Sequence, residues 1–185
     1  MTLGQAFDSV LTAALAGAEW AWAKLYDDLS PLVLGFLRGR GAVDPEDLTG
    51  EVFLQIVRDI RSFEGGERDL RAWVLSIAHH RLLDDIRYRK RRPADAVPDD
   101  LLQEIAPRGD VEADAMSSIT AERAVRIIRT LTPDQQDVLL LRMVADLSIE
   151  EVARVVDKPP GAIKALQHRG LAQLRKKISR EGVSL

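Results

Sequence analysis

The 185-residue chain contains no cysteine, which excludes disulfide bonds, thiolate metal sites and cysteine nucleophiles. Aromatic residues make up only 5%, and no alternating apolar run is bounded by Asn-Gly or Asp-Gly, so β-structure is not indicated. No stretch approaches the roughly 18 consecutive apolar residues of a membrane span. Val10 to Ala18 imitates the end of a signal peptide, but no Lys or Arg precedes it. These absences favour a reducing, cytoplasmic setting without membrane insertion.

Positive charge is also scarce overall, because 26 Lys and Arg residues stand against 29 Asp and Glu residues. The balance changes along the chain. Residues 1–92 carry 13 positive and 14 negative charges, residues 93–122 carry one and eight, and residues 123–185 carry 12 and seven. The deficit therefore lies in an acidic middle segment, and the flanking blocks keep local basic runs that suit a nucleic acid.

Helical periodicity dominates both flanking blocks. Asp44-Pro45 and Thr132-Pro133 each place a capping residue before a proline at the first helical position. The expected helices span residues 5–16, 18–29, 31–39, 45–60, 70–92, 121–130, 133–144, 149–156 and 161–179.

The acidic middle segment holds prolines and acids without an apolar face, so it is expected to be a linker. The predicted fold class is all-α, with two small helical domains joined by this flexible acidic linker. The expected boundaries are 1–92, 93–120 and 121–185.

A helix-turn-helix pattern lies near the C-terminus. Leu147 to Val156 forms a short predicted helix with a capping box at Ser148 and Glu151. Asp157-Lys158-Pro159-Pro160 then interrupts the chain before a second helix. Between Lys158 and Arg180 there are seven Lys and Arg residues and no acid, whereas an ordinary surface helix mixes both signs. This asymmetry favours DNA binding over a solvated face, with the second helix in a major groove.

The predicted helix 70–92 joins an apolar stripe to a basic end. Five positive charges occupy the six positions from Arg87 to Arg92. They fit a solvated helix end that complements the negative pole of the helix dipole, and they also fit a ridge that follows phosphates and releases counterions. The apolar stripe comprises Leu70, Trp73, Val74, Ile77, Ala78, Leu82 and Ile86.

Two separated sets of motifs resemble the extracytoplasmic-function (ECF) subfamily of bacterial RNA polymerase sigma factors. The motifs that resemble region 4 are Leu131-Thr132-Pro133, Gln136, Val138-Leu139-Leu140-Leu141-Arg142, Leu147 to Ala153, Gly161-Ala162-Ile163-Lys164 and His168-Arg169. Those that resemble region 2 are Asp47-Leu48, Glu51-Val52-Phe53, and Trp73 to Ala78 with Asp84 and Arg87. The resemblance covers about residues 5–92 and 121–180, and both halves occur in the family's order.

The resemblance implies a dissociable specificity subunit of RNA polymerase. Such a subunit binds core RNA polymerase, at the β′ clamp coiled coil and the β flap, and directs promoter-specific initiation. Its N-terminal domain opens the minus-10 element of promoter DNA, and its C-terminal domain reads the minus-35 duplex. No catalytic site and no cofactor are implied, and an anti-sigma factor is implied as a further partner.

By this resemblance, the helix 45–60 docks on core polymerase. Its candidate residues are Asp47, Leu48, Glu51, Val52, Gln55 and Ile56. Val52 and Ile56 also fit a core stripe, which is the favoured interpretation for the apolar members. Gly50 stands where the family usually has Gln, so one contact is missing.

An extruded promoter base needs a flat wall, hydrogen bonds to its edge and cations near its phosphates. The minus-10 candidates are Phe63, Arg68, Arg71, His79, His80, Arg87, Arg89, Lys90 and Arg91. His80 stands where relatives commonly carry Asn, so the base preference there is open. Trp73 is interpreted as core rather than as a stacking platform. A metal site at His79-His80 is not favoured, because adjacent helical side chains point about 100° apart.

The minus-35 candidates lie in and behind the first turn of the second helix. They are Gly161, Ala162, Lys164, Ala165, Gln167, His168, Arg169 and Lys176. Ala165 and Leu166 stand where Ser and Arg are common, so part of the preference is expected to come from backbone contacts and DNA shape.

Two other functions fit parts of the chain. An autonomous helix-turn-helix regulator would sense a signal with residues 1–92, but they show no pocket motif and no receiver-like alternation of strands and helices. A metal-dependent hydrolase would use His79, His80 and Asp84, but no second ligand cluster or nucleophile motif accompanies them. The acidic segment is either a nucleic-acid mimic in the RNA exit region or a solvated spacer.

Overall fold

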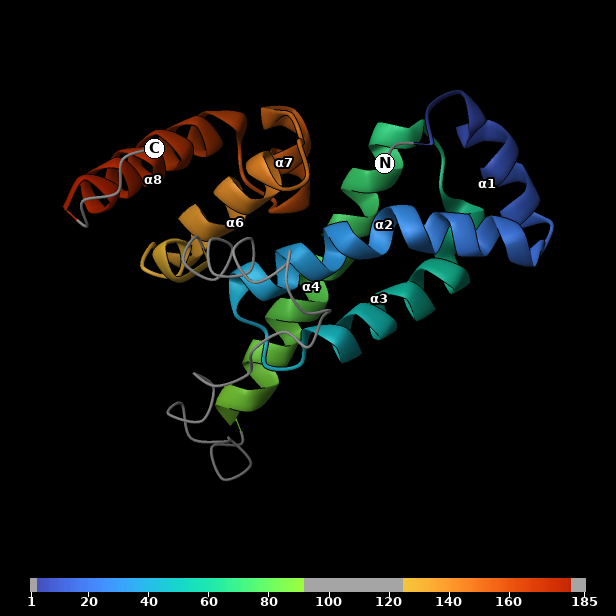
Figure 1. Ribbon diagram of the computed structural model, residues 1–185, viewed down its shortest axis with the longest axis horizontal. Helices are drawn as coiled ribbons and strands as arrows, with labels where there is room; N and C mark the ends of the chain where they lie inside the picture. The colour runs from blue at the N-terminus through green and yellow to red at the C-terminus, as the bar shows by residue number, and fades with distance from the viewer. Residues whose placement is uncertain (1–2, 92–124, 181–185) are drawn as a thin grey trace, which may run out of the picture.

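A computed structural model describes residues 3–91 and 125–180, and these residues form helices and no strands (Figure 1). The predicted all-α class is confirmed, and the predicted linker 93–120 lies outside the described residues. Of the predicted helix 121–130, residues 125–130 are described: 125–128 are helical and 129–130 form a turn. The elements are η1 Gly4–Ala6, α1 Phe7–Leu15, α2 Glu19–Arg40, α3 Pro45–Asp59, η2 Ile60–Ser62, α4 Glu67–Arg91, α6 Pro133–Met143, α7 Ile149–Val155 and α8 Pro160–Arg180.

α2 runs unbroken through Pro31, so the prediction of two helices, 18–29 and 31–39, was wrong. A proline inside a helix costs about 3 kcal/mol, because it removes a hydrogen bond and crowds the preceding turn. Burial on both sides of the proline outweighs this cost. The buried side chains of α2 are Ala21, Leu25, Leu29, Val33, Phe36 and Leu37.

The predicted helix starts carry the caps that the sequence indicates. The Asp44 carboxylate accepts a hydrogen bond from the Asp47 backbone N–H at 3.0 Å. At the start of α7, the Ser148 hydroxyl accepts from the Glu151 N–H, and the Glu151 carboxylate accepts from the Ser148 N–H. The predicted capping box is therefore present, and it fixes the first helix of the helix-turn-helix.

The helices form two groups that pack against each other (Figure 1). α1 and α3 pack on α2, and α4 crosses both α2 and α3. α6, α7 and α8 form the second group, in which α6 packs on α2 and α7 packs on α4. The largest core cluster includes buried side chains of both groups, such as Phe36 and Leu75 from the first and Val138 and Leu141 from the second. One continuous core thus holds the two groups together.

The described residues contain neither a membrane-spanning helix nor a metal-binding cluster. None of these helices combines the length and the apolar character needed to cross a membrane. Within residues 3–91 and 125–180, no three His, Cys, Asp or Glu side chains are grouped so that they could hold a metal ion.

Candidate nucleic-acid interface

The helix-turn-helix is built from α7, a four-residue turn and α8. Ala153 of α7 is buried, Ile163 of α8 is fully buried, and the two helices pack against each other. A Cβ atom at Gly170 would lie 2.9 Å from a Leu139 methyl group, so α8 approaches α6 closely at this glycine. These contacts fix which face of α8 points outward.

The outward face of α8 carries the predicted minus-35 residues. Ala162 and Gln167 are half-buried. The exposed members are Gly161, Lys164, Ala165, His168, Arg169 and Lys176. Among the described residues, Lys164 and Arg169 form no ion pair. The structure therefore exposes six of the eight predicted residues along α8 and leaves Lys164 and Arg169 available to a polyanion.

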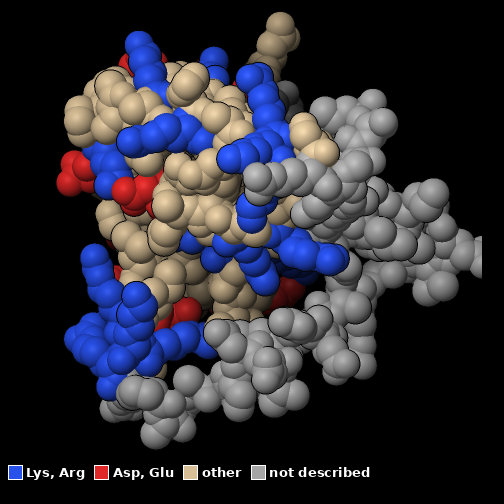
Figure 2. All heavy atoms as spheres, turned by 90° about the vertical axis from the view of Figure 1, so that its left-hand side faces the viewer, with Lys and Arg blue, Asp and Glu red and all other residues tan. Residues whose placement is uncertain are grey.

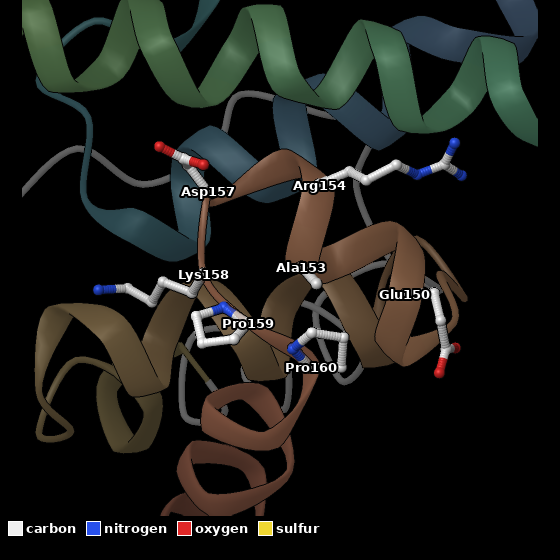
Figure 3. A pocket seen from close by; sticks show the side chains of 7 residues that line it. All are labelled: Glu150, Ala153, Arg154, Asp157, Lys158, Pro159 and Pro160. Carbon is white, nitrogen blue, oxygen red and sulfur yellow. The ribbon is translucent and has the colours of Figure 1, made fainter.

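The turn of the helix-turn-helix encloses a shallow hollow (Figure 3). Asp157 adopts a positive φ of 51°, which reverses the chain after α7. In Figure 3, Arg154 and Asp157 point toward α4, whereas Glu150 points away from it. The Lys158 ammonium lies 3.1 Å from the Asp134 carboxylate. The hollow has no buried ionisable side chain, and the turn serves to orient α8.

The predicted minus-10 loop, residues 63–66, is fixed by contacts at its first residue and just after its last residue. The Phe63 and Trp73 rings lie 5.5 Å apart, and both are half-buried and pack against the core, as predicted for Trp73. The Glu67 carboxylate accepts hydrogen bonds from the backbone N–H groups of Leu3 and Gly4, each at 2.8 Å. The N-terminal segment is thereby tied to the end of the loop.

Two of the predicted minus-10 arginines, Arg68 and Arg71, form ion pairs with acids of other helices, and His79 is buried. Arg71 pairs with Asp28 at 3.1 Å. Arg68 Nη2 lies 3.6 Å from a Glu151 carboxylate oxygen. His79 is buried on the side of α4 that faces α6, and His80 beside it is exposed.

The C-terminal end of α4 presents the predicted basic ridge. Arg87 pairs with Asp84 at 3.0 Å and Arg89 pairs with Asp85 at 2.9 Å. Lys90 and Arg91 are exposed. Figure 2 shows a dense group of Lys and Arg at the lower left, at the level where α4 ends in Figure 1. Positive charge is therefore concentrated at this end of α4, although two of its three described arginines, Arg87 and Arg89, pair with acids of their own helix.

The predicted polymerase-binding helix α3 divides its residues between core and surface. Asp47 and Glu51 are exposed, and Gln55 accepts a hydrogen bond from Arg81 at 2.9 Å. Leu48, Val52 and Ile56 are buried, which agrees with the core interpretation of the apolar members.

Sequence reasoning missed two exposed apolar side chains on α3. Leu54 is 60% exposed and Val57 is 53% exposed. They follow Asp47 and Glu51 at steps of three and four residues, so all four lie on one outer face. That spacing was the signal that could have identified them.

A second missed feature lies between α2 and α6. Arg40 Nε donates to the Asp137 carboxylate at 2.5 Å, and Arg40 Nη1 donates to the Gln136 side-chain oxygen at 2.7 Å. His79 Nε2 lies 3.4 Å from the other Asp137 oxygen. The Arg40, Asp137 and His79 side chains are only 6–7% exposed. No sequence signal pointed to this cluster, because its members are far apart in the chain.

Both halves of the chain match known families. Residues 25–92 match Sigma-70 region 2, and residues 121–174 match Sigma-70, region 4. The chain is 31% identical over 172 residues to the ECF RNA polymerase sigma factor ShbA of Streptomyces griseus, with coverage of 88% of this chain and 90% of ShbA. It is 33% identical over 163 residues to the ECF RNA polymerase sigma factor BldN of Streptomyces coelicolor, which covers 87% of this chain and 61% of BldN.

Two solved structures share the fold. CnrH, in complex with the cytosolic domain of CnrY, gives a TM-score of 0.66 at 18% identity and covers 92% of this chain and 96% of CnrH. RpoE from Bartonella quintana, in complex with the anti-sigma factor NepR, gives a TM-score of 0.65 at 19% identity and covers 85% of this chain and 96% of RpoE. The matches to Sigma-70 region 2 and region 4 and the 31% identity to ShbA show that the chain belongs to the ECF subfamily of RNA polymerase sigma factors, which direct transcription initiation.

Proposed function

We propose that this sigma factor reads the minus-35 duplex with the outward face of α8 and holds the minus-10 strand with the 63–66 loop and α4. Residues 1–92 would form the region 2 domain, residues 121–185 the region 4 domain, and residues 93–120 their connection. The chain would act in the cytoplasm as a specificity subunit without a catalytic site of its own.

The observation that carries the proposal is the division of α8 into two faces. Its inner face contains Ile163 and the close glycine contact at Gly170, so the orientation of the helix is fixed. Its outer face presents Lys164, His168 and Arg169 to solvent. A helix of this kind meets a major groove with its N-terminal turns, and its later cations meet phosphates.

Core polymerase would bind the outer face of α3. Leu54 and Val57 supply exposed apolar area, and Asp47 and Glu51 flank them with negative charge. An exposed apolar pair framed by charges is typical of a protein interface with an apolar centre and a polar rim. The β′ clamp coiled coil is the proposed partner for this face, and the β flap is the proposed partner for region 4.

The minus-10 strand would contact the 63–66 loop and the exposed residues of α4. His80 would meet a base edge, and Arg87, Lys90 and Arg91 would lie near phosphates. Phe63, which is half-buried, would offer the exposed part of its ring to a base.

An anti-sigma factor is the proposed regulator. RpoE of Bartonella quintana was solved in complex with the anti-sigma factor NepR, and CnrH was solved in complex with the cytosolic domain of CnrY. The fold is shared over at least 85% of this chain, so a partner of this class would find the same helices here.

Transcription in vitro tests the proposal. The chain is mixed with sigma-free core polymerase and a library of promoter fragments, and full-length transcripts are sequenced. The double variant Lys164→Ala/Arg169→Ala should lower initiation by about thirtyfold or more, because each lost base contact costs about 1–3 kcal/mol. Lys24→Ala, which removes an exposed lysine of α2, is the matched control and should retain activity.

Two results would contradict the proposal. Full activity of the double variant would show that the outward face of α8 does not read the promoter. Tight, specific duplex binding by the chain alone, without any effect on core polymerase, would instead identify an autonomous helix-turn-helix regulator. Circular dichroism of the double variant should match that of the unmodified chain, because both side chains are exposed.

A further inference from the structure

The first residue of α4 carries a carboxylate that is bonded to the N-terminal segment. One oxygen of Glu67 accepts a hydrogen bond from the Leu3 backbone N–H and the other accepts from the Gly4 N–H, each at 2.8 Å. These two N–H groups stand at the start of the short helix η1, so neither has an acceptor within its own helix. Glu67 supplies that acceptor from a position more than 60 residues later in the chain.

The N-terminal segment is itself packed on the domain. Leu3 and Ala6 pack against the hydrophobic core, and Phe7, the first residue of α1, is buried. α1 in turn packs on α2. In Figure 1, the N-terminal end of the described chain lies beside the first turn of α4. The Glu67 carboxylate therefore connects the start of α4 to a segment whose own position is fixed by burial.

The 63–66 loop lies directly before this connection and depends on the same helical turn. Gly65 has a φ of 140°, and a Cβ atom there would lie 2.7 Å from the Asp69 Cβ, so this conformation requires glycine. The Gly66 N–H donates a hydrogen bond to the Asp69 carboxylate at 3.2 Å. Because both contacts are made with the first turn of α4, the loop follows the position of that turn.

A loop that receives an extruded base benefits from being ordered beforehand. Ordering a loop at the moment of binding subtracts from affinity, and a loop that is already held in its bound position avoids this loss. The first turn of α4 also carries Arg68 and is followed by Arg71, two residues of the minus-10 set. A contact that fixes this turn thus acts on the loop and on these arginines together.

We propose that Glu67 is a positioning residue for the minus-10 strand, because its two hydrogen bonds to the N-terminal segment hold the 63–66 loop and the first turn of α4 in place. The inference rests on the proposed function. It also has a definite sign. A carboxylate near a promoter strand repels phosphates, so a purely electrostatic role predicts tighter strand binding when Glu67 is neutralised. The positioning role predicts weaker binding.

Replacing the carboxylate tests the proposal. Glu67→Met keeps a long side chain but cannot accept from the two N–H groups. Its holoenzyme with core polymerase should bind a fluorescein-labelled minus-10 single strand, taken from a promoter that the unmodified chain uses in vitro, about tenfold more weakly. Affinity for core polymerase and for the minus-35 duplex should not change. Glu19→Met, the same change at the exposed first position of α2, should leave all three affinities unaltered.

A backbone change tests the other side of the contact. Leu3 has a φ of −66°, close to the roughly −65° that proline imposes, so Leu3→Pro removes the N–H donor without altering φ. Leu3→Ala is the matched control, because it keeps the donor and loses the packing of the leucine side chain. Leu3→Pro should bind the minus-10 strand about threefold more weakly than Leu3→Ala. In a Glu67→Met chain the two Leu3 variants should bind it equally.

The outcomes separate the two proposals. No binding of the minus-10 strand by the unmodified holoenzyme would overturn the proposed function. Strand binding that Glu67→Met leaves unchanged or tightens would overturn the positioning role alone. A parallel loss of affinity for core polymerase and both DNA probes would reduce Glu67 to a stabilising residue. Equal strand affinities of Leu3→Pro and Leu3→Ala would exclude the N-terminal segment, and this pair decides the question if Glu67→Met does not fold.

Discussion

The inward and outward faces of helices α6–α8 differ in what becomes of their charges. On the inward face, Asp137 is buried and forms a salt bridge with Arg40, so its charge is balanced within the chain. On the outward face, Lys164 and Arg169 are exposed, and no described carboxylate pairs with them. A charged residue therefore marks a ligand surface only when the fold leaves it unpaired. Burial and partner, more than sign, distinguish the two faces.

The largest expected effect on stability comes from Asp137, the buried charge on the inward face. Asp137→Asn leaves the Arg40 guanidinium buried without its counter-charge, which should lower the free energy of unfolding by about 3–5 kcal/mol. Asp134→Asn on the same helix removes only a partly exposed pair with Lys158 and should cost less than about 1 kcal/mol. Urea unfolding followed by circular dichroism measures both. Similar losses in the two variants would remove the distinction between the faces.

A smaller effect is expected from two glycines with different surroundings. Gly39→Ala places a methyl group against the buried Leu140 side chain, which should cost about 1–3 kcal/mol. Gly50→Ala, on the exposed face of α3, meets open space and should add up to about 1 kcal/mol of stability through helix propensity. Thermal unfolding of the two variants gives the comparison. A stabilised Gly39→Ala chain would mean that α2 and α6 do not pack closely in solution.

The smallest effect is expected at an exposed ion pair. The Arg38 guanidinium donates a hydrogen bond to Glu46 and holds the pKa of that carboxyl below its usual value. Because the pKa is lowered in the folded state, the pair stabilises the fold above the ordinary glutamate pKa and loses this effect as the pH falls through the lowered value. Solvent screens both side chains, which are 46% and 59% exposed, so Arg38→Ala should cost less than about 0.5 kcal/mol at neutral pH.

The pH dependence of that difference is the measurement. The unfolding free energies of the unmodified chain and Arg38→Ala should differ slightly at pH 7 and converge in acid, where Glu46 is protonated in both states. A difference that grows as the pH falls would contradict the lowered pKa.

Sequence reasoning succeeded where the signal is local. The capping box at Ser148, the acid-free run from Lys158 and the apolar stripe of α4 each depend on residues within a few turns, and the structure bears out the helices that they predict. Family motifs supplied the order of the two regions. The boundaries of α4 differ modestly, since this helix begins at Glu67 rather than at Leu70.

It failed where distant residues decide. Pro31 was misread as a helix start because its local preference is overruled by side chains that pack on either side of it. Arg40 and Asp137 are 97 residues apart, so no spacing rule links them. Gly39 of α2 was visible in the sequence, but its meaning depends on which helix lies across it. His79 was assigned to the minus-10 set from its place in the motif. It is buried because Asp137, which is distant in the sequence, packs beside it.

The buried Arg40–Asp137 pair also affects how the contact between α2 and α6 responds to heat. Charged groups are hydrated with a strongly unfavourable entropy, so warming makes their hydration less favourable and lowers the cost of taking them out of water. The apolar part of this contact gains no comparable advantage at high temperature. On warming, the Arg40–Asp137 salt bridge should therefore weaken more slowly than the apolar packing around it. It should be the last contact between the two helix groups to break.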